Sequence, residues 1–168
     1  MSRPYTGSSD GVASGHRAGM NEFIKQIERI TDKALWNNGS FGVRNMRGKE
    51  SLSVHATGRA CDLSFRNMPD DRGKPNGRKY AMKVMDLITK KADDLGLEMI
   101  IDYATPKFGR AWRCDRMAWK KYEKDTVHGG GSLSSDWIHV ELSPKAADNV
   151  EMIKGVFADI SETTLMAE

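Results

Sequence analysis

The pattern of apolar and polar positions predicts three helices that each bury one face. Apolar residues recur every three or four positions within residues 20–35, 78–95 and 144–156, which is the period of an amphipathic helix. Gly96 follows the second stripe, where a C-terminal cap is expected. Ser143 and Pro144 precede the third stripe as an N-cap and a first helical residue. We therefore expect helices from Met20 to Leu35, from Arg78 to Leu95 and from Pro144 through Val156.

Short runs with strand-like composition lie between these helices. They span Ser40–Arg44, Ala60–Phe65, Glu98–Tyr103 and Trp137–Leu142, and each is bounded by turn or polar residues. The strands come in pairs between helices and do not alternate with them one by one. This order predicts an α+β domain, with a small antiparallel sheet covered by about three helices.

Length and charge limit the classes of protein to consider. A chain of 168 residues with 39% apolar and 29% charged residues is typical of one globular domain, so we expect residues 1–168 to form a single unit, with residues 1–15 flexible. The 26 basic and 23 acidic residues are mixed along the chain, which argues against nucleic acid as the partner. No apolar stretch is long enough to span a membrane. We expect a monomer.

Residues that bind metals concentrate in two places, residues 53–62 and 136–141. A catalytic zinc ion takes three protein ligands from His and carboxylate side chains and leaves a fourth position for water. His55, Asp62 and His139 meet that requirement, and Gly58 permits a bend between the first two. The sequence therefore predicts one Zn²⁺ ion bound by these three side chains.

Hydrolysis also needs a carboxylate near the metal to accept a proton from water. Asp136 and Glu141 are both candidates. On an ideal strand Glu141 shares a face with His139, which favours Glu141. Asp136 is expected in the loop before the strand, where this alternation need not hold.

The two motifs resemble those of the zinc D-alanyl-D-alanine peptidase family. Its members include bacterial D-Ala-D-Ala dipeptidases and carboxypeptidases and the L-alanyl-D-glutamate endolysins of phages. The first motif, Ser-x-His-x-x-Gly-x-Ala-x-Asp, begins at Ser53 and ends at Asp62, and the second pairs Asp136 with His139 three residues later. The resemblance implies zinc ligation by His55, Asp62 and His139, and it favours Asp136 over Glu141 as the general base.

The resemblance also implies residues that contact the substrate. An upstream arginine of the family binds a substrate carboxylate or the developing oxyanion; Arg44 and Arg47 are the candidates, and we favour Arg44. Many relatives have His-x-His in the second motif, whereas Trp137 takes the first of those places here. We expect the role of the absent histidine to be lost or taken over by His128. Ser53, Arg47, His128 and Trp137 are the candidate substrate-binding residues.

The expected function is therefore zinc-dependent cleavage of a peptide bond in bacterial peptidoglycan, with Asp136 accepting a proton from water and passing it to the leaving amine. The polar segment 1–15 lacks the apolar stretch of a secretory signal, so we expect a phage endolysin or tail-associated lysin made in the cytoplasm and reaching the wall through holin-type release or as part of a virion. One alternative is a noncatalytic zinc-containing module of the same fold. Another is nucleic-acid binding through the basic, Trp-containing stretch Lys107–Lys121.

Overall fold

The structure, a computed structural model, describes residues 1–46, 51–124 and 135–167. Its described strands form one six-stranded sheet in the order β1-β2-β6-β3-β4-β5, and every neighbouring pair is antiparallel. The strands are β1 (Trp36–Gly39), β2 (Ala60–Ser64), β3 (Leu97–Asp102), β4 (Arg110–Arg113), β5 (Ala118–Lys121) and β6 (Trp137–Leu142). The α+β class with an antiparallel sheet is thus confirmed.

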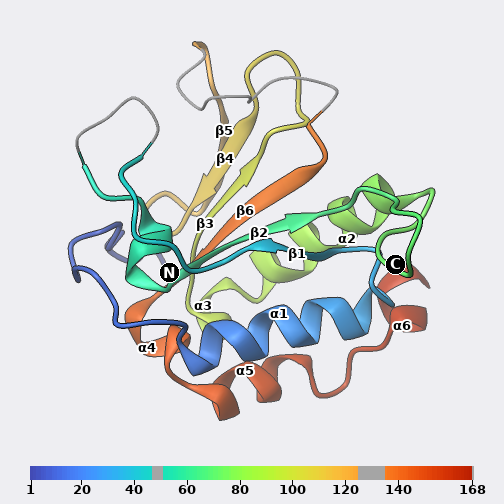
Figure 1. The fold of residues 1–168 in the computed structure, drawn as a ribbon, viewed down its shortest axis with the longest axis horizontal. Coiled ribbons are helices and arrows are strands. Elements are labelled where there is room, and N and C mark those ends of the chain that lie inside the picture. The colour runs from blue at the N-terminus through green and yellow to red at the C-terminus, as the bar shows by residue number, and fades with distance from the viewer. Residues whose placement is uncertain (47–50, 125–134, 168) are drawn as a thin grey trace.

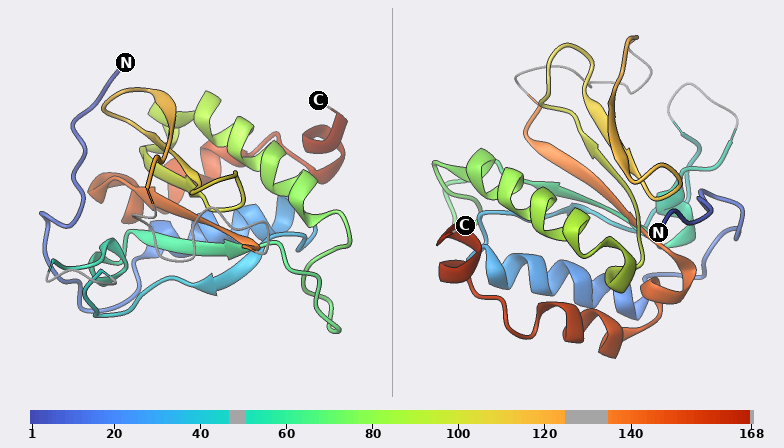
Figure 2. Two further views of the ribbon diagram at one scale, coloured as in Figure 1. Left: turned by 90° about the horizontal axis from the view of Figure 1, so that it is seen from above. Right: turned by 180° about the vertical axis from the view of Figure 1, so that it is seen from behind.

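The helices gather on one face of this sheet (Figures 1 and 2). They are α1 (Ala18–Ile30), α2 (Gly77–Lys90), α3 (Ala92–Leu95), α4 (Pro144–Ala147), α5 (Val150–Phe157) and α6 (Glu162–Ala167). A separate short 3-10 helix, η1, spans Val54–Thr57. Helix α1 packs on β1 and β2, α2 packs on β3, and α5 packs on the outer side of α1. No described helix is both long and apolar enough to cross a membrane.

The core lies between the sheet and the helix layer. On β6, Ile138, Val140 and Leu142 belong to the apolar cluster, and His139 and Glu141 alternate with them. Because successive side chains of a strand point to opposite faces, these two polar residues lie on the face away from the helices. That open face is where the candidate site is built.

The first predicted helix ends earlier than expected. It stops at Ile30, and Asp32 and Lys33 adopt positive φ angles of 44° and 58°, which no helix continues through. The following turn still buries Ala34 and Leu35, so their apolar character resembled a further helical turn. The prediction of a helix through Leu35 was therefore wrong in its last turn.

The other two predicted helices are each divided. Helix α2 ends at Lys90 and α3 follows, with Gly96 at φ 64° forming the predicted cap. The Ser143 side chain caps α4 as expected, but that helix stops at Ala147. The Asn149 side chain accepts a hydrogen bond from the Met152 amide at 2.9 Å, which starts α5 as a new helix. Local capping therefore replaces one long helix with two short ones.

Three strand predictions are confirmed in place and one is wrong. The predicted strand Ser40–Arg44 is not formed; the chain pairs instead at β1, immediately before it, and then runs irregularly beside η1. Strands β4 and β5 were not predicted, because their charged residues hide the alternation. The free thiols Cys61 and Cys114 are both buried, Cys61 on β2 and Cys114 directly after β4.

The N-terminal segment, residues 1–17, lies against the domain and not apart from it. The Arg3 amide donates to the Cys114 carbonyl at 3.0 Å, and the Ala13 amide donates to the Ala56 carbonyl at 2.9 Å. Figure 2 shows this dark blue segment passing beside η1. It thus adds polar partners at one edge of the open face.

Candidate metal centre

His55, Asp62 and His139 come from three separate elements and meet on the open face. His55 lies on η1, Asp62 on β2 and His139 on β6. Asp62 and His139 are direct partners in the β2–β6 register. Each of the three offers one ligand atom, and these atoms all lie within 4.8 Å of one another. The structure therefore brings together the three ligands predicted from the sequence.

A tight turn places His55 beside Asp62. The Ser53 side chain caps η1 by accepting a hydrogen bond from the His55 amide at 3.3 Å. Gly58 ends η1 with φ 72°, a conformation that glycine adopts without a steric penalty. The predicted bend at Gly58 is confirmed, and it leaves His55 Nε2 3.4 Å from Asp62 Oδ2.

The spacing of the donor atoms is close to that around one metal ion. His139 Nδ1 lies 3.1 Å from Asp62 Oδ1, and the two imidazole rings are 4.9 Å apart between centroids. Ligand atoms roughly 2.0–2.2 Å from one ion at tetrahedral angles are about 3.3–3.6 Å apart. Two imidazoles and one carboxylate are also a donor set that zinc prefers. A divalent ion could therefore bind here with small side-chain movements.

Hydrogen bonds behind the ligands orient both imidazoles. The Ser40 carbonyl lies 2.6 Å from His55 Nδ1, and because a carbonyl only accepts, this nitrogen carries the proton. The Glu141 carboxylate lies 2.8 Å from His139 Nε2 and fixes that ring in the same way. The nitrogens that remain, Nε2 of His55 and Nδ1 of His139, are the two that face Asp62.

The electrostatics of the site are set by carboxylates on both sides of His139. Burial raises the pKa of Asp62, but hydrogen bonds from His139 and His55 lower it by a larger amount. The net pKa of Asp62 is therefore well below its usual range. Burial lowers the pKa of His139, yet its bonds to Asp62 and Glu141 raise it to about 10. Both carboxylates are therefore ionised at neutral pH, and a cation at Nδ1 would take the place of one proton.

Asp136, the predicted general base, is not part of the three-ligand group. Its carboxylate pairs with Arg66, with Oδ2 2.6 Å from Nε and Oδ1 3.1 Å from Nη2. Its carbonyl accepts from the Phe65 amide at 2.8 Å, which places Asp136 just before β6, as predicted. Glu141, the choice favoured by strand alternation, does share a face with His139, but it is buried and bonded to that imidazole.

The candidate substrate residues differ in how close they come to the centre. Arg44 is exposed, and its carbonyl accepts a hydrogen bond from the Ser53 amide at 3.0 Å, which places it beside the turn that carries His55. Trp137 lies against Tyr103, with ring centroids 5.3 Å apart. Arg47 and His128 lie outside the described residues.

Residues that the sequence analysis overlooked also shape the site. Burial raises the pKa of Tyr103, and the negative charge of Asp62 raises it further, so its hydroxyl stays protonated at neutral pH. The Tyr5 hydroxyl donates to Glu141 at 2.7 Å. The sequence analysis placed Glu141 on the face of His139 but as a candidate base and not as the partner of its imidazole, whereas nothing in the polar N-terminus pointed to Tyr5.

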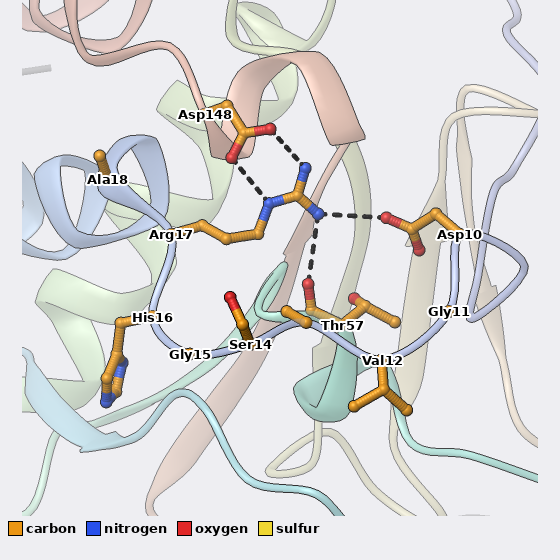
Figure 3. A pocket seen from close by; sticks show the side chains of 11 residues that line it. Asp10, Gly11, Val12, Ser14, Gly15, His16, Arg17, Ala18, Thr57 and Asp148 are labelled. Atoms are coloured by element: carbon orange, nitrogen blue, oxygen red, sulfur yellow. Dashed lines mark hydrogen bonds and ion pairs between the residues drawn. The ribbon is translucent and has the colours of Figure 1, made fainter.

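A hollow of about 380 Å³ lies to one side of this centre, and ion pairs within the protein cross it (Figure 3). It is lined by residues 10–18, Thr57 and Asp148 and includes none of the three ligands. The Arg17 guanidinium crosses it to bond Asp148 at 2.7 and 2.9 Å and Asp10 at 3.1 Å. Because that guanidinium is fully engaged, Arg17 is not available to a ligand in this hollow.

The chain matches no protein-family model, no curated protein and no solved structure. The family resemblance therefore remains a prediction from the motif residues. The grouping of His55, Asp62 and His139 is a feature of the structure itself and makes this face the candidate metal centre.

Proposed function

We propose that the protein is a zinc-dependent peptidase that hydrolyses a peptide bond in the stem peptides or cross-links of bacterial peptidoglycan, as a phage endolysin or tail-associated lysin does. The observation that carries this proposal is the group of His55, Asp62 and His139 on the open face of the sheet. Hydrogen bonds to the Ser40 carbonyl and the Glu141 carboxylate orient the two imidazoles so that their remaining nitrogens face Asp62. The choice of peptidoglycan as substrate comes from the resemblance of the two motifs.

In this proposal zinc, when bound, polarises the scissile carbonyl and lowers the pKa of a water molecule. Asp136 accepts the proton of that water and returns it to the leaving amine. Arg44 lies beside the turn of His55, is exposed, and binds a substrate carboxylate. The Trp137 and Tyr103 rings lie together, and Tyr103 is close enough to Asp62 for that charge to raise its pKa, so the two rings are placed to contact the substrate.

The ion pair between Asp136 and Arg66 bears directly on this proposal. Arg66 is half-exposed, at 50% of its side-chain surface, and ion pairs exposed to water contribute little to stability. Opening the pair therefore costs little free energy and would release Asp136 toward a bound substrate. The pair is compatible with a base that becomes available when substrate enters.

The proposal is tested by zinc content and by release of new amino groups from purified peptidoglycan, before and after chelation. We expect about one zinc ion per chain and release that stops when a chelator removes it. His55→Ala should lose both zinc and release. Asp94→Ala is the control, because this exposed carboxylate on α3 lies outside the ligand group and should behave as wild type. Full release without metal would refute the proposal.

A second candidate is a noncatalytic zinc-containing module, and the Asp136–Arg66 pair is the observation that favours it. While this pair is closed, both oxygens of Asp136 are bonded to a guanidinium and the carboxylate is not poised to accept a proton from water. In that case zinc would bind but no amino groups would be released. An Asp136→Ala variant that keeps zinc and full biological function would support this candidate.

A further inference from the structure

The N-terminal segment supplies hydrogen-bond partners to charged residues on the open face. The Thr6 hydroxyl donates to Glu98 at 2.6 Å. Asp10 pairs with Arg59, whose side chain is completely buried, at 2.8 and 3.0 Å. Buried charges require such partners, because an unpaired ion in the protein interior is strongly destabilising. Residues 1–17 are thus part of the structure of this face.

Tyr5 connects this segment to the metal centre. Its hydroxyl donates to Glu141 Oε2 at 2.7 Å, while Glu141 Oε1 lies 2.8 Å from His139 Nε2. His139 Nδ1 in turn lies 3.1 Å from Asp62. A continuous chain of hydrogen bonds therefore runs from Tyr5 through Glu141 to a ligand that faces the metal position.

The two oxygens of Glu141 have separate partners, which is what fixes the carboxylate. Glu141 is buried, at 3% exposure, so water does not readily replace a lost donor. The Tyr5 ring is itself held, because the Arg113 guanidinium lies 4.2 Å from the ring centroid. Without the Tyr5 hydroxyl, Oε2 would lack its donor and the carboxylate would be less firmly oriented toward His139.

We propose that Tyr5 is a positioning residue of the metal centre, acting through Glu141 to fix the orientation and tautomer of His139. This inference rests on the proposed metal site. The N-terminal segment would then contribute to metal affinity although Tyr5 lies far from Glu141 in the sequence. Groups behind metal ligands typically change affinity by about 10–100-fold when removed.

The test is the affinity for Zn²⁺ of the full-length Tyr5→Phe variant, measured by competition with a chromophoric chelator. This substitution removes only the hydroxyl and keeps the ring beside Arg113. We expect affinity to fall by about tenfold, with an altered visible absorption spectrum of the Co²⁺-substituted protein. Tyr80→Phe is the matched control, because the Tyr80 hydroxyl also donates to a carboxylate, Glu162, but on the helix side of the sheet. It should leave both measurements unchanged.

A double-mutant cycle separates positioning from a general loss of stability. If Tyr5 acts through Glu141, then Tyr5→Phe should cost no further zinc affinity once Glu141→Gln is present. Independent, additive losses would overturn the proposal. Equal affinity of wild type and Tyr5→Phe would also overturn it.

A measurement on the wild-type protein keeps the proposal testable if the Tyr5→Phe variant does not fold. Imidazole ¹⁵N spectra of the zinc-loaded protein should show His139 protonated at Nε2 and His55 at Nδ1. The opposite tautomer of His139 would overturn the proposal. Failure of the proposed metal site has a different signature, because wild type itself would then bind no zinc and the His55→Ala variant would not differ from it.

Discussion

Asp136 and His139 are three residues apart, yet their side chains have different partners in the structure. His139 points to Asp62, whereas Asp136 is paired with Arg66 at the start of β6. In the proposed mechanism His139 binds the metal and Asp136 moves a proton, so the two residues should respond differently to substitution. This difference can be measured one residue at a time.

Replacing Asp136 with Asn should leave zinc content unchanged, because Asp136 is not in the ligand group. Turnover of peptidoglycan should fall by about 100-fold or more, since an amide cannot accept the proton and general bases contribute roughly 10²–10⁴-fold. Steady-state release of amino groups and zinc content measured together would check this. Arg66→Gln is the control, because it removes the ion pair but keeps the base, and it should retain most of the activity. Full turnover by Asp136→Asn would contradict the assignment.

The residues of the site were predictable only where a side chain and its spacing carry the signal. His55, Asp62 and His139 belong to side-chain motifs, so their types and spacing pointed to them. The partner of His55 is the backbone carbonyl of Ser40, and a backbone carbonyl has no sequence signature. Tyr5 lies 136 positions from Glu141, and only folding brings them together. The ligands were therefore visible in the sequence, and the groups that orient them were not.

Among the elements, η1 has the most direct influence on the metal centre, because its end sets the position of His55. Gly58 closes η1 at φ 72°, and a Cβ placed there would lie 3.0 Å from side-chain atoms of Arg17. An L-residue in this conformation is strained, and the Arg17 side chain is itself held by Asp148. The turn therefore tolerates little change.

Gly58→Ala should lower the free energy of unfolding by about 1–2 kcal/mol, because alanine is disfavoured at positive φ. It should also weaken zinc binding, since relaxing the strain shifts His55 relative to Asp62. Denaturant unfolding and zinc titration would measure the two effects. Gly155→Ala is a suitable control: Gly155 lies in α5 with no atom near its Cβ position, and alanine there should stabilise the helix by about 0.5–1 kcal/mol. Equal stability of Gly58→Ala and wild type would refute the strain argument.

Asp102 joins the helix layer to the sheet. It lies at the end of β3 with its side chain buried, and Arg78 of α2 bonds both of its oxygens at 2.8 and 2.9 Å. Arg110 of β4 adds a bond at 3.1 Å. Burial raises the pKa of Asp102, but the hydrogen bonds and charge of Arg78 lower it more, so the net pKa is below its usual range.

Because the folded-state pKa is lowered, the stabilisation from Asp102 is present above the ordinary carboxyl pKa of about 3.9 and is lost as the pH falls through the folded-state value. Asp102→Asn should therefore destabilise the protein by about 2 kcal/mol near pH 7, with a difference that shrinks below about pH 4. Urea unfolding at several pH values would show it. Asp94→Asn, at an exposed position of α3, should change little. A difference that stays constant down to pH 3 would contradict this account.

The same elements indicate how far the fold followed from the sequence. Strands β2, β3 and β6 carry apolar residues at their core-facing positions and were predicted nearly in place. Strands β4 and β5 have Arg and Lys at most outward positions, so their alternation gave no signal. Helix α1 ends early, at a local turn that begins with Thr31, and the apolar periodicity does not indicate this turn. Helix ends depend on capping geometry, which is why they were the least predictable part.

At the scale of the whole molecule, the apolar core and the candidate metal centre lie on opposite faces of the sheet. The helices cover one face of the sheet (Figure 2), and strand alternation puts the side chains of Asp62 and His139 on the other. The three ligands come from η1, β2 and β6, which meet only when the sheet has formed. An ion bound to all three therefore binds the folded state and not the unfolded chain.

Zinc should consequently raise the melting temperature in proportion to its binding free energy. At free zinc about 100 times the dissociation constant, binding adds about 2.7 kcal/mol of stability. For a chain of this length that corresponds to a rise of roughly 5–10 °C, which thermal unfolding would detect and a chelator should reverse. Mg²⁺ at the same concentration should have no such effect, because it prefers all-oxygen octahedral sites. Asp62→Asn should abolish the rise, since it removes the ionised ligand that lies between the two imidazoles. An equal rise in that variant would place the ion elsewhere on the protein and remove the basis for a catalytic centre on this face.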